Sequence, residues 1–261
     1  MSDTRRQFLK AAAAGLAASA AMNAKDDPVL GLIFPPLNRP VPPEGLIMYP
    51  SGVKFIVQGL GLESMTPAGY DKVIPLIKPA AEKLAQQGAQ AIVLMGTSLT
   101  FYKGAAFNQQ LTDSIKSATG LPCTTMSTAV IEGLKTVGAK RLAVSTAYDD
   151  QVNARLTAFL KENGFEVLKL KGLGIEDMES TNRVTQPELL KFSVDVRNSA
   201  PAANAMLVSC GGLRTLEMLA PLEKQTRVPA VSSTPHALRA GVRLLGLSGK
   251  VKGYGTLLEK G

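Results

Sequence analysis

Residues 205–212, Ala-Met-Leu-Val-Ser-Cys-Gly-Gly, contain an apolar run that ends in a cysteine and two glycines. Residues 91–98, Ala-Ile-Val-Leu-Met-Gly-Thr-Ser, repeat this construction 114 positions earlier. A second pair follows in the same order, because Leu-Pro-Cys-Thr-Thr at 121–125 resembles Val-Pro-Ala-Val-Ser at 228–232. This internal similarity predicts two similar halves, each with buried strands that end in a turn.

From residue 28 onward, short runs of Val, Ile and Leu alternate with longer segments of helical period, which predicts parallel strands joined by helices. The predicted strands are Val29–Phe34, Phe55–Gln58, Ala91–Met95, Cys123–Met126, Arg141–Ser145, Phe165–Leu170, Ala205–Ser209 and Ala230–Ser232. The predicted helices include Pro67–Gln87, Phe107–Ala118, Asp149–Asn163 and Pro187–Ser199. Asp149 is placed to cap its helix, and Gly164 to end it.

The expected fold class is therefore α/β, with two similar halves that are each a short parallel sheet flanked by helices. We expect residues 28–126 plus 235–261 to form the first half and residues 127–234 to form the second. Ligands bind beyond the carboxyl ends of parallel strands, so both repeated turns point into one cleft. The active site is expected in that cleft, between the halves.

The composition is that of a folded protein with one sizeable core or two small ones, since 45% of the 261 residues are hydrophobic. The formal charge of +8 suggests nucleic acid at first. However, Arg5, Arg6 and Lys10 lie in the first ten residues, and the other basic residues are scattered without interleaved aromatics. We therefore expect no nucleic-acid binding.

The first residues have the pattern of an export signal. Thr-Arg-Arg-Gln-Phe-Leu-Lys at 4–10 precedes a weakly apolar, alanine-rich run from Ala11 to Met22, which is too short to span a bilayer. This resembles a twin-arginine signal peptide, predicted here to comprise residues 1–24. The implied location is the periplasm, with the twin-arginine export machinery as a partner. After cleavage we expect a monomer without stable membrane association.

Several kinds of site lack their usual residues. His236 is the only histidine, and the acidic residues form no spaced cluster with it or with the cysteines, so we predict no protein-bound metal. A structural role is expected for His236. No G-x-S-x-G elbow is present, which disfavours a serine hydrolase. The glycine pairs at 59–61 and 172–174 lack the rest of a dinucleotide motif, so no nicotinamide or flavin cofactor is expected.

Cys210 occupies the position best suited to chemistry. It follows an apolar strand, and Gly211 and Gly212 allow a ligand to approach the backbone, whose free N–H groups favour negative oxygen. The spacing alone is equally compatible with a small buried cysteine at a tight turn. Cys123 lies inside a predicted strand without an adjacent glycine and is expected to be a core residue. Although a periplasmic pair could form a disulfide, we expect Cys210 to stay free.

The facing turn supplies hydrogen-bond donors. Thr97 and Ser98 follow Gly96, and Tyr148 lies just past the predicted strand Arg141–Ser145. Together with the N–H of Gly211, these groups are suited to hold a carboxylate or an enediolate. Each of them alone is weak support, because Thr and Ser often cap helices and Tyr often fills the end of a strand.

These segments resemble the arylmalonate decarboxylase family of the aspartate/glutamate/hydantoin racemase superfamily. The resemblance extends over the chain after residue 28 and rests on residues 96–102, 121–127 and 209–213, with further matches at 34–36, 59–62 and 145–148. It implies a racemase-like fold and a cofactor-independent carboxy-lyase with Cys210 as the catalytic acid. It also implies an apolar pocket made of Pro36, Leu62, Met65, Gly96, Leu99 and Met178.

Gly96 stands where the related racemases carry a first cysteine, so one thiol remains. The resemblance implies that loss of carbon dioxide from a 2-aryl or 2-alkenyl malonate forms the carbanion, which Cys210 then protonates on one face. Thr181 falls where this family tends to have an apolar residue, which leaves the substrate's size open. Two alternatives remain: a racemase or maleate isomerase-like cis-trans isomerase of a small amino acid or dicarboxylate, and a noncatalytic binding protein.

Overall fold

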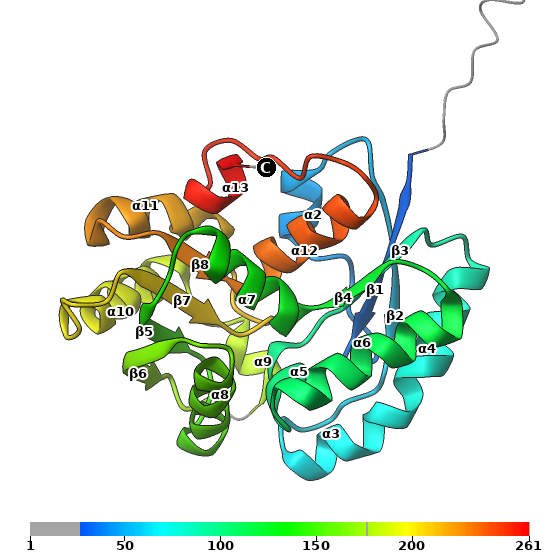
Figure 1. The fold of residues 1–261 in the computed structure, drawn as a ribbon, viewed down its shortest axis with the longest axis horizontal. Helices are drawn as coiled ribbons and strands as arrows, with labels where there is room; N and C mark the ends of the chain where they lie inside the picture. The colour runs from blue at the N-terminus through cyan, green and yellow to red at the C-terminus, as the bar shows by residue number, and fades with distance from the viewer. Residues whose placement is uncertain (1–26, 176, 261) are drawn as a thin grey trace, which may run out of the picture.

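The computed structural model describes residues 27–175 and 177–260, which form two four-stranded parallel sheets (Figure 1). The first sheet has the order β2-β1-β3-β4, and its strands are β1 (Val29–Phe34), β2 (Lys54–Gly59), β3 (Ala91–Leu94) and β4 (Cys123–Thr125). The second has the order β6-β5-β7-β8, with β5 (Arg141–Thr146), β6 (Glu166–Gly172), β7 (Ala205–Ser209) and β8 (Ala230–Ser232). The equivalent order of the two sheets confirms the predicted α/β fold with two similar halves.

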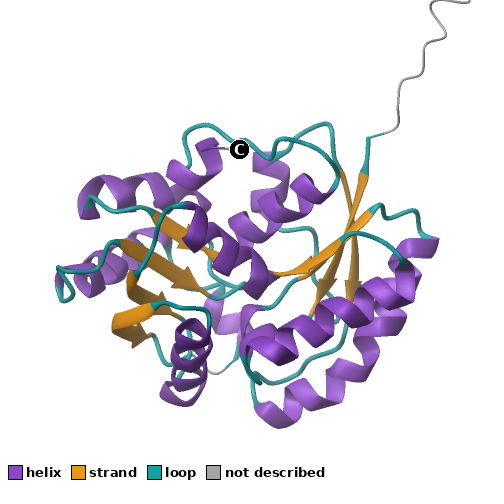
Figure 2. Ribbon diagram, viewed as in Figure 1, coloured by secondary structure: helices purple, strands orange, loops and turns teal. Residues whose placement is uncertain are grey.

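Helices lie on either side of each sheet (Figure 2). In the first half and at its end they are α2 (Pro43–Met48), α3 (Pro67–Val73), the 3₁₀ turn η1 (Ile74–Leu76), α4 (Ile77–Gln86), α5 (Thr97–Phe101), α6 (Ala105–Thr119) and α7 (Met126–Thr136). The remaining ones are α8 (Asp150–Glu162), α9 (Met178–Thr181), α10 (Gln186–Asn198), α11 (Leu216–Thr226), α12 (Ser233–Leu244) and α13 (Thr256–Lys260).

All eight predicted strands are present, with ends that differ by at most two residues. The helix predicted over Pro67–Gln87 is instead divided into α3, η1 and α4. Pro75 lies in the 3₁₀ turn, where its missing N–H and its ring interrupt the helical hydrogen bonding. The predicted cap is confirmed, because the Asp149 side chain accepts a hydrogen bond from the Val152 N–H over 2.8 Å.

Two helices, α7 and α12, lie between the sheets and contact both halves (Figure 1). Met126 and Ala129 of α7 pack in the same cluster as the first sheet and α12, whereas Val130, Ile131 and Leu134 of α7 pack in the core of the second half. A single amphipathic helix therefore connects the two cores. The carboxyl-terminal helix α13, which we expected in the first half, packs Leu257 and Leu258 into the core of the second.

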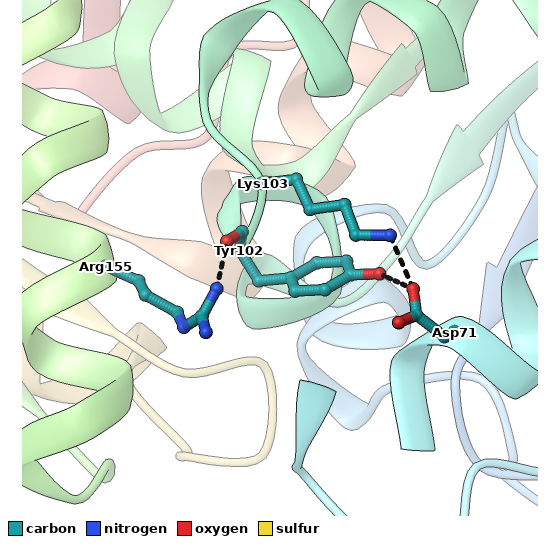
Figure 3. Close-up of polar contacts among 4 residues, drawn as sticks. All are labelled: Asp71, Tyr102, Lys103 and Arg155. Atoms are coloured by element: carbon teal, nitrogen blue, oxygen red, sulfur yellow. Dashed lines mark hydrogen bonds and ion pairs between the residues drawn. The ribbon is translucent and has the colours of Figure 1, made fainter. Parts of the chain in front are cut away.

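A hydrogen bond also crosses between the halves, from α8 to the end of α5, two helices that lie side by side in the lower part of Figure 1. Arg155 of α8 donates from Nη1 to the backbone oxygen of Tyr102, at the end of α5, over 2.9 Å (Figure 3). The Tyr102 hydroxyl and the Lys103 ammonium both donate to the Asp71 carboxylate of α3. Helix α5 is thus anchored at the end opposite Thr97.

No helix in residues 27–175 or 177–260 is long and apolar enough to cross a membrane.

The residues of the predicted signal peptide, 1–24, lie outside the described part of the chain.

Candidate active site

A pocket lies between the two sheets at the carboxyl ends of their central strands, as expected. It is lined by Phe34, Pro35, Pro36, Arg39, Leu62, Met65, Gly96, Thr97, Ser98, Met126, Tyr148, Thr181, Cys210, Gly211 and Gly212. About 40 Å³ of it is open to water-sized molecules. This space is enough for a few waters.

Cys210 forms one wall, where the chain leaves β7 and turns. Its side chain is buried, and the Gly212 N–H donates a hydrogen bond to the sulfur over 3.4 Å. Burial raises the pKa of the Cys210 thiol, and the smaller opposing effects come from that N–H and from the positive charge of Arg39. The thiol is therefore protonated at neutral pH, which suits a proton donor.

The facing wall is the turn from β3 into α5. Gly96 has a φ of +129°, a conformation that residues with a side chain rarely adopt. This turn directs Thr97 and Ser98, both less than 10% exposed, to the pocket. The Thr97 hydroxyl donates to the Ser233 hydroxyl over 2.8 Å and lies 3.0 Å from the sulfur of Met126. The two walls therefore come from different halves.

Tyr148 enters the pocket from the end of β5. Its hydroxyl lies 3.4 Å from the Ser209 hydroxyl, and its ring meets Phe101 edge-on at a centroid distance of 5.8 Å. Complete burial raises the pKa of Tyr148 well above its usual value. The phenol stays protonated and can donate a hydrogen bond to a negative oxygen.

The predicted apolar pocket is assembled in part. Pro36, Leu62, Met65 and Gly96 line the cavity. Leu99 is not among the lining residues; it is fully buried in the core cluster of the first half. Met178 belongs to α9, but its side chain lies outside what the structure describes.

Six lining residues lie outside the predicted set of site residues: Phe34, Pro35, Arg39, Met126, Thr181 and Gly212. Met126 follows β4, and the rule that carboxyl strand ends share one edge could have indicated it. Thr181 comes so close to the backbone that a Cβ on Gly212 would lie 2.1 Å from its hydroxyl oxygen. Position 212 therefore requires a glycine, because Thr181 packs directly against its backbone.

Arg39 had no sequence signal, because it lies in the loop between β1 and α2. Its Nη2 donates to the backbone oxygen of Gly211 over 3.3 Å, and its guanidinium lies 5.8 Å from the Phe34 ring centroid. Among the described residues, no carboxylate forms an ion pair with it. The Gly211 oxygen also accepts from the Thr234 hydroxyl over 3.2 Å. Both contacts orient the peptide whose N–H, on Gly212, points at the Cys210 sulfur.

The other candidates have structural surroundings. His236 is buried in the first turns of α12, with Nδ1 within 2.9 Å of the Ser232 backbone nitrogen, and burial lowers its pKa to about 4. Cys123 is half-buried, and its sulfur contacts the Thr112 carbonyl oxygen. Both cysteines are free. In the described ranges, no three His, Cys, Asp or Glu residues are grouped to hold a metal ion.

The chain is similar to known decarboxylases. Residues 30–258 match the arylmalonate decarboxylase family. The arylmalonate decarboxylase of Bordetella bronchiseptica is 45% identical over 240 residues, which cover 92% of this chain and 100% of that protein. A maleate isomerase of Pseudomonas putida is 27% identical over 161 residues, which cover 60% of this chain and 64% of the isomerase.

Solved structures agree with this. A double mutant of arylmalonate decarboxylase in its liganded form has a TM-score of 0.87 at 45% identity, covering 90% of this chain and 100% of that one. A variant of the maleate isomerase from Pseudomonas putida S16, crystallised with maleate, has a TM-score of 0.82 at 20% identity and covers 89% of this chain and 98% of its own. The isomerase shares the racemase-like fold. By the family match and the identity along nearly its whole length, the chain belongs to the arylmalonate decarboxylase family.

Proposed function

We propose that this chain catalyses the cofactor-independent decarboxylation of 2-aryl or 2-alkenyl malonates to monocarboxylic acids. Its family makes it a decarboxylase, that is a carboxy-lyase. The observation that carries the proposal is one protonated thiol, Cys210, in a pocket whose opposite wall has Gly96 and two hydroxyls.

The chemistry begins with the loss of one carboxylate. The bond between the α-carbon and that carboxylate breaks, carbon dioxide leaves, and the electron pair spreads over the substituent and the retained carboxylate as an enediolate. Thr97, Ser98, Tyr148 and the Gly211 N–H are proposed to hold the retained carboxylate, and for this the Thr97 hydroxyl turns its single hydrogen from Ser233 to the substrate. Hydrogen bonds to it strengthen as its charge grows, so they stabilise the transition state more than the substrate.

The departing carboxylate is proposed to face Pro36, Leu62 and Met65. These side chains cannot replace the water that an anion loses on binding, whereas neutral carbon dioxide needs no such solvation. Breaking of the Cys210 S–H bond then delivers a proton to the α-carbon, and the thiolate regains a proton from water. Because Gly96 offers no second thiol, the proton arrives from one face and one enantiomer is formed.

The direct test is carbon dioxide release from 2-methyl-2-phenylmalonate by the purified chain in metal-free buffer, with chiral analysis of the product. We expect one enantiomer in excess and no turnover by Cys210→Ala. The matched control is Cys123→Ala, which removes the other thiol outside the pocket and should retain activity. Turnover by Cys210→Ala equal to that of the unchanged chain would refute the role of the thiol. Interconversion of maleate and fumarate without gas release would favour an isomerase instead.

We further propose that residues 1–24 direct twin-arginine export to the periplasm and that the mature chain is a monomer there. The paired Arg5 and Arg6, followed by Phe8-Leu9 and an alanine-rich segment, support export. A fusion of residues 1–27 to a folded reporter should reach the periplasm, and replacing both arginines by lysine should retain it in the cytoplasm. Equal export of both fusions would contradict the assignment. Light scattering on the mature chain measures its oligomeric state.

A further inference from the structure

A second hollow, of about 770 Å³, lies between α6, α7 and α12 and shares no lining residue with the catalytic pocket. We call it the α7–α12 hollow. Its lining includes His236 and Cys123, which have no part in the proposed reaction. Charged side chains from α7 and α12 also line it.

Arg239 lines this hollow from α12 and is only 8% exposed. Its Nε is buried without a hydrogen-bond partner. Among the described residues, no acceptor is bonded to its guanidinium and no carboxylate pairs with it. The buried Nε has lost its water without gaining a hydrogen bond, which is costly for a charged group, whereas the rest of the guanidinium faces the hollow.

The surrounding charges increase this cost. Arg243 lies one helical turn further along α12, and Lys135 faces the hollow from α7; both are exposed at its rim. Against these three cations, Glu132 is the one described carboxylate in the lining, and it forms no ion pair. Burial, followed by the nearby Arg243, lowers the pKa of Arg239. His236 adds no charge at neutral pH.

We propose that the α7–α12 hollow binds a small oxyanion, a phosphate or a carboxylate, on the guanidinium of Arg239. The planar fork of a guanidinium matches two oxygens of either group, and Arg243 and Lys135 supply further positive charge at the rim. The anion compensates Arg239 and joins α7 to α12. These helices begin at Met126, which lines the catalytic pocket, and at Ser233, which contacts Thr97.

The test is calorimetric titration of the purified chain with inorganic phosphate and, separately, with acetate, at constant ionic strength in chloride buffer. Saturable binding of either oxyanion supports the site, and the tighter one identifies its ligand class. Arg239→Met should weaken binding about tenfold or more, since it removes the charged hydrogen bonds of the guanidinium. Arg243→Gln, at an exposed position that should fold normally, should weaken it to a smaller extent. Glu132→Gln should tighten it by removing repulsion.

Two controls separate this site from the catalytic pocket and from a merely structural arginine. Ser98→Ala, in the catalytic pocket, should bind the anion as the unchanged chain does. In chloride buffer without an oxyanion, Arg239→Met should melt at a higher temperature than the unchanged chain, because the buried, unpartnered Nε of the cation is gone. Absence of saturable binding, undiminished affinity in Arg239→Met, or loss of binding in Ser98→Ala would overturn the proposal. So would weaker binding in Glu132→Gln.

Discussion

The hydroxyl of Thr97 donates a hydrogen bond to the hydroxyl oxygen of Ser233 over 2.8 Å, across the boundary between α5 and α12. The same Ser233 oxygen accepts a hydrogen bond from the backbone N–H of Cys210 over 3.2 Å. One buried oxygen therefore joins the turn that carries the proposed carboxylate donors to the turn that carries the proton donor. The distance between the two walls of the pocket depends on this side chain.

Ser233→Ala should lower kcat/KM for an arylmalonate by about tenfold to a hundredfold, because two buried donors lose their acceptor and both walls can shift. Steady-state kinetics with 2-methyl-2-phenylmalonate measure this. The matched control is Ser145→Ala, since the Ser145 hydroxyl is buried without a hydrogen-bond partner among the described residues. Unchanged kcat/KM in Ser233→Ala would show that the bridge does not set the geometry.

Gly96→Cys should slow decarboxylation and add racemisation of the 2-arylpropionate product, because a second thiol can exchange the proton on the other face. It should also destabilise the fold by roughly 1–3 kcal/mol. Gly96 has a positive φ, and a Cβ there would lie 2.5 Å from the Cγ of Pro35. Gly96→Ala introduces the same strain without a thiol. Optically pure product that keeps its configuration with Gly96→Cys would exclude the two-face explanation.

The pH profile should reflect the raised pKa of Cys210. The thiol is active only when protonated, so kcat/KM should fall as the pH rises through its pKa, and burial moves that fall to higher pH than for an ordinary thiol. Arg39→Gln removes the positive charge that opposes this shift, so the decrease in kcat/KM should occur at a still higher pH.

Alkylation of the thiol by iodoacetamide, followed against pH in the absence of substrate, gives an independent measurement of the same pKa. Lys103→Gln is a suitable control, because Lys103 is exposed and bonded to Asp71 rather than to the pocket. If Arg39→Gln and the unchanged chain have identical profiles in both measurements, Arg39 does not act on the thiol.

Stability should decline in mild acid because of His236. Burial lowers its folded pKa to about 4, whereas the unfolded value is about 6.5, so the unfolded state binds the proton more readily. The contribution of neutral His236 is complete above pH ~6.5 and is lost as the pH falls towards ~4, up to about 3 kcal/mol in total. Urea unfolding at several pH values measures this against His236→Gln. If the unfolding free energies of the two proteins depend on pH in the same way, His236 is not the cause of the decline.

Much of the fold can be predicted from the sequence, because short Val, Ile and Leu runs between helical segments are buried most readily as the strands of a parallel sheet. The repeated strand ends indicated two halves, and the geometry of parallel sheets brings Thr97, Ser98, Tyr148 and Cys210 to one cleft. The division of the helix at Pro75 was also readable in principle, since proline lacks the donor that a helix needs.

The tertiary structure decided what depends on contacts distant in the chain. Leu99, next to Ser98, belongs to the core of the first half and is not among the residues that line the pocket. Arg39 reaches Gly211 across 172 positions, and Ser233 reaches Thr97 across 136, so no local pattern reveals them. The sequence by itself determined which groups can do chemistry and which strand ends carry them. Only packing decided that Cys210 is buried and protonated and that Ser233 is bonded to both walls, because burial and hydrogen-bond partners arise from the assembled fold.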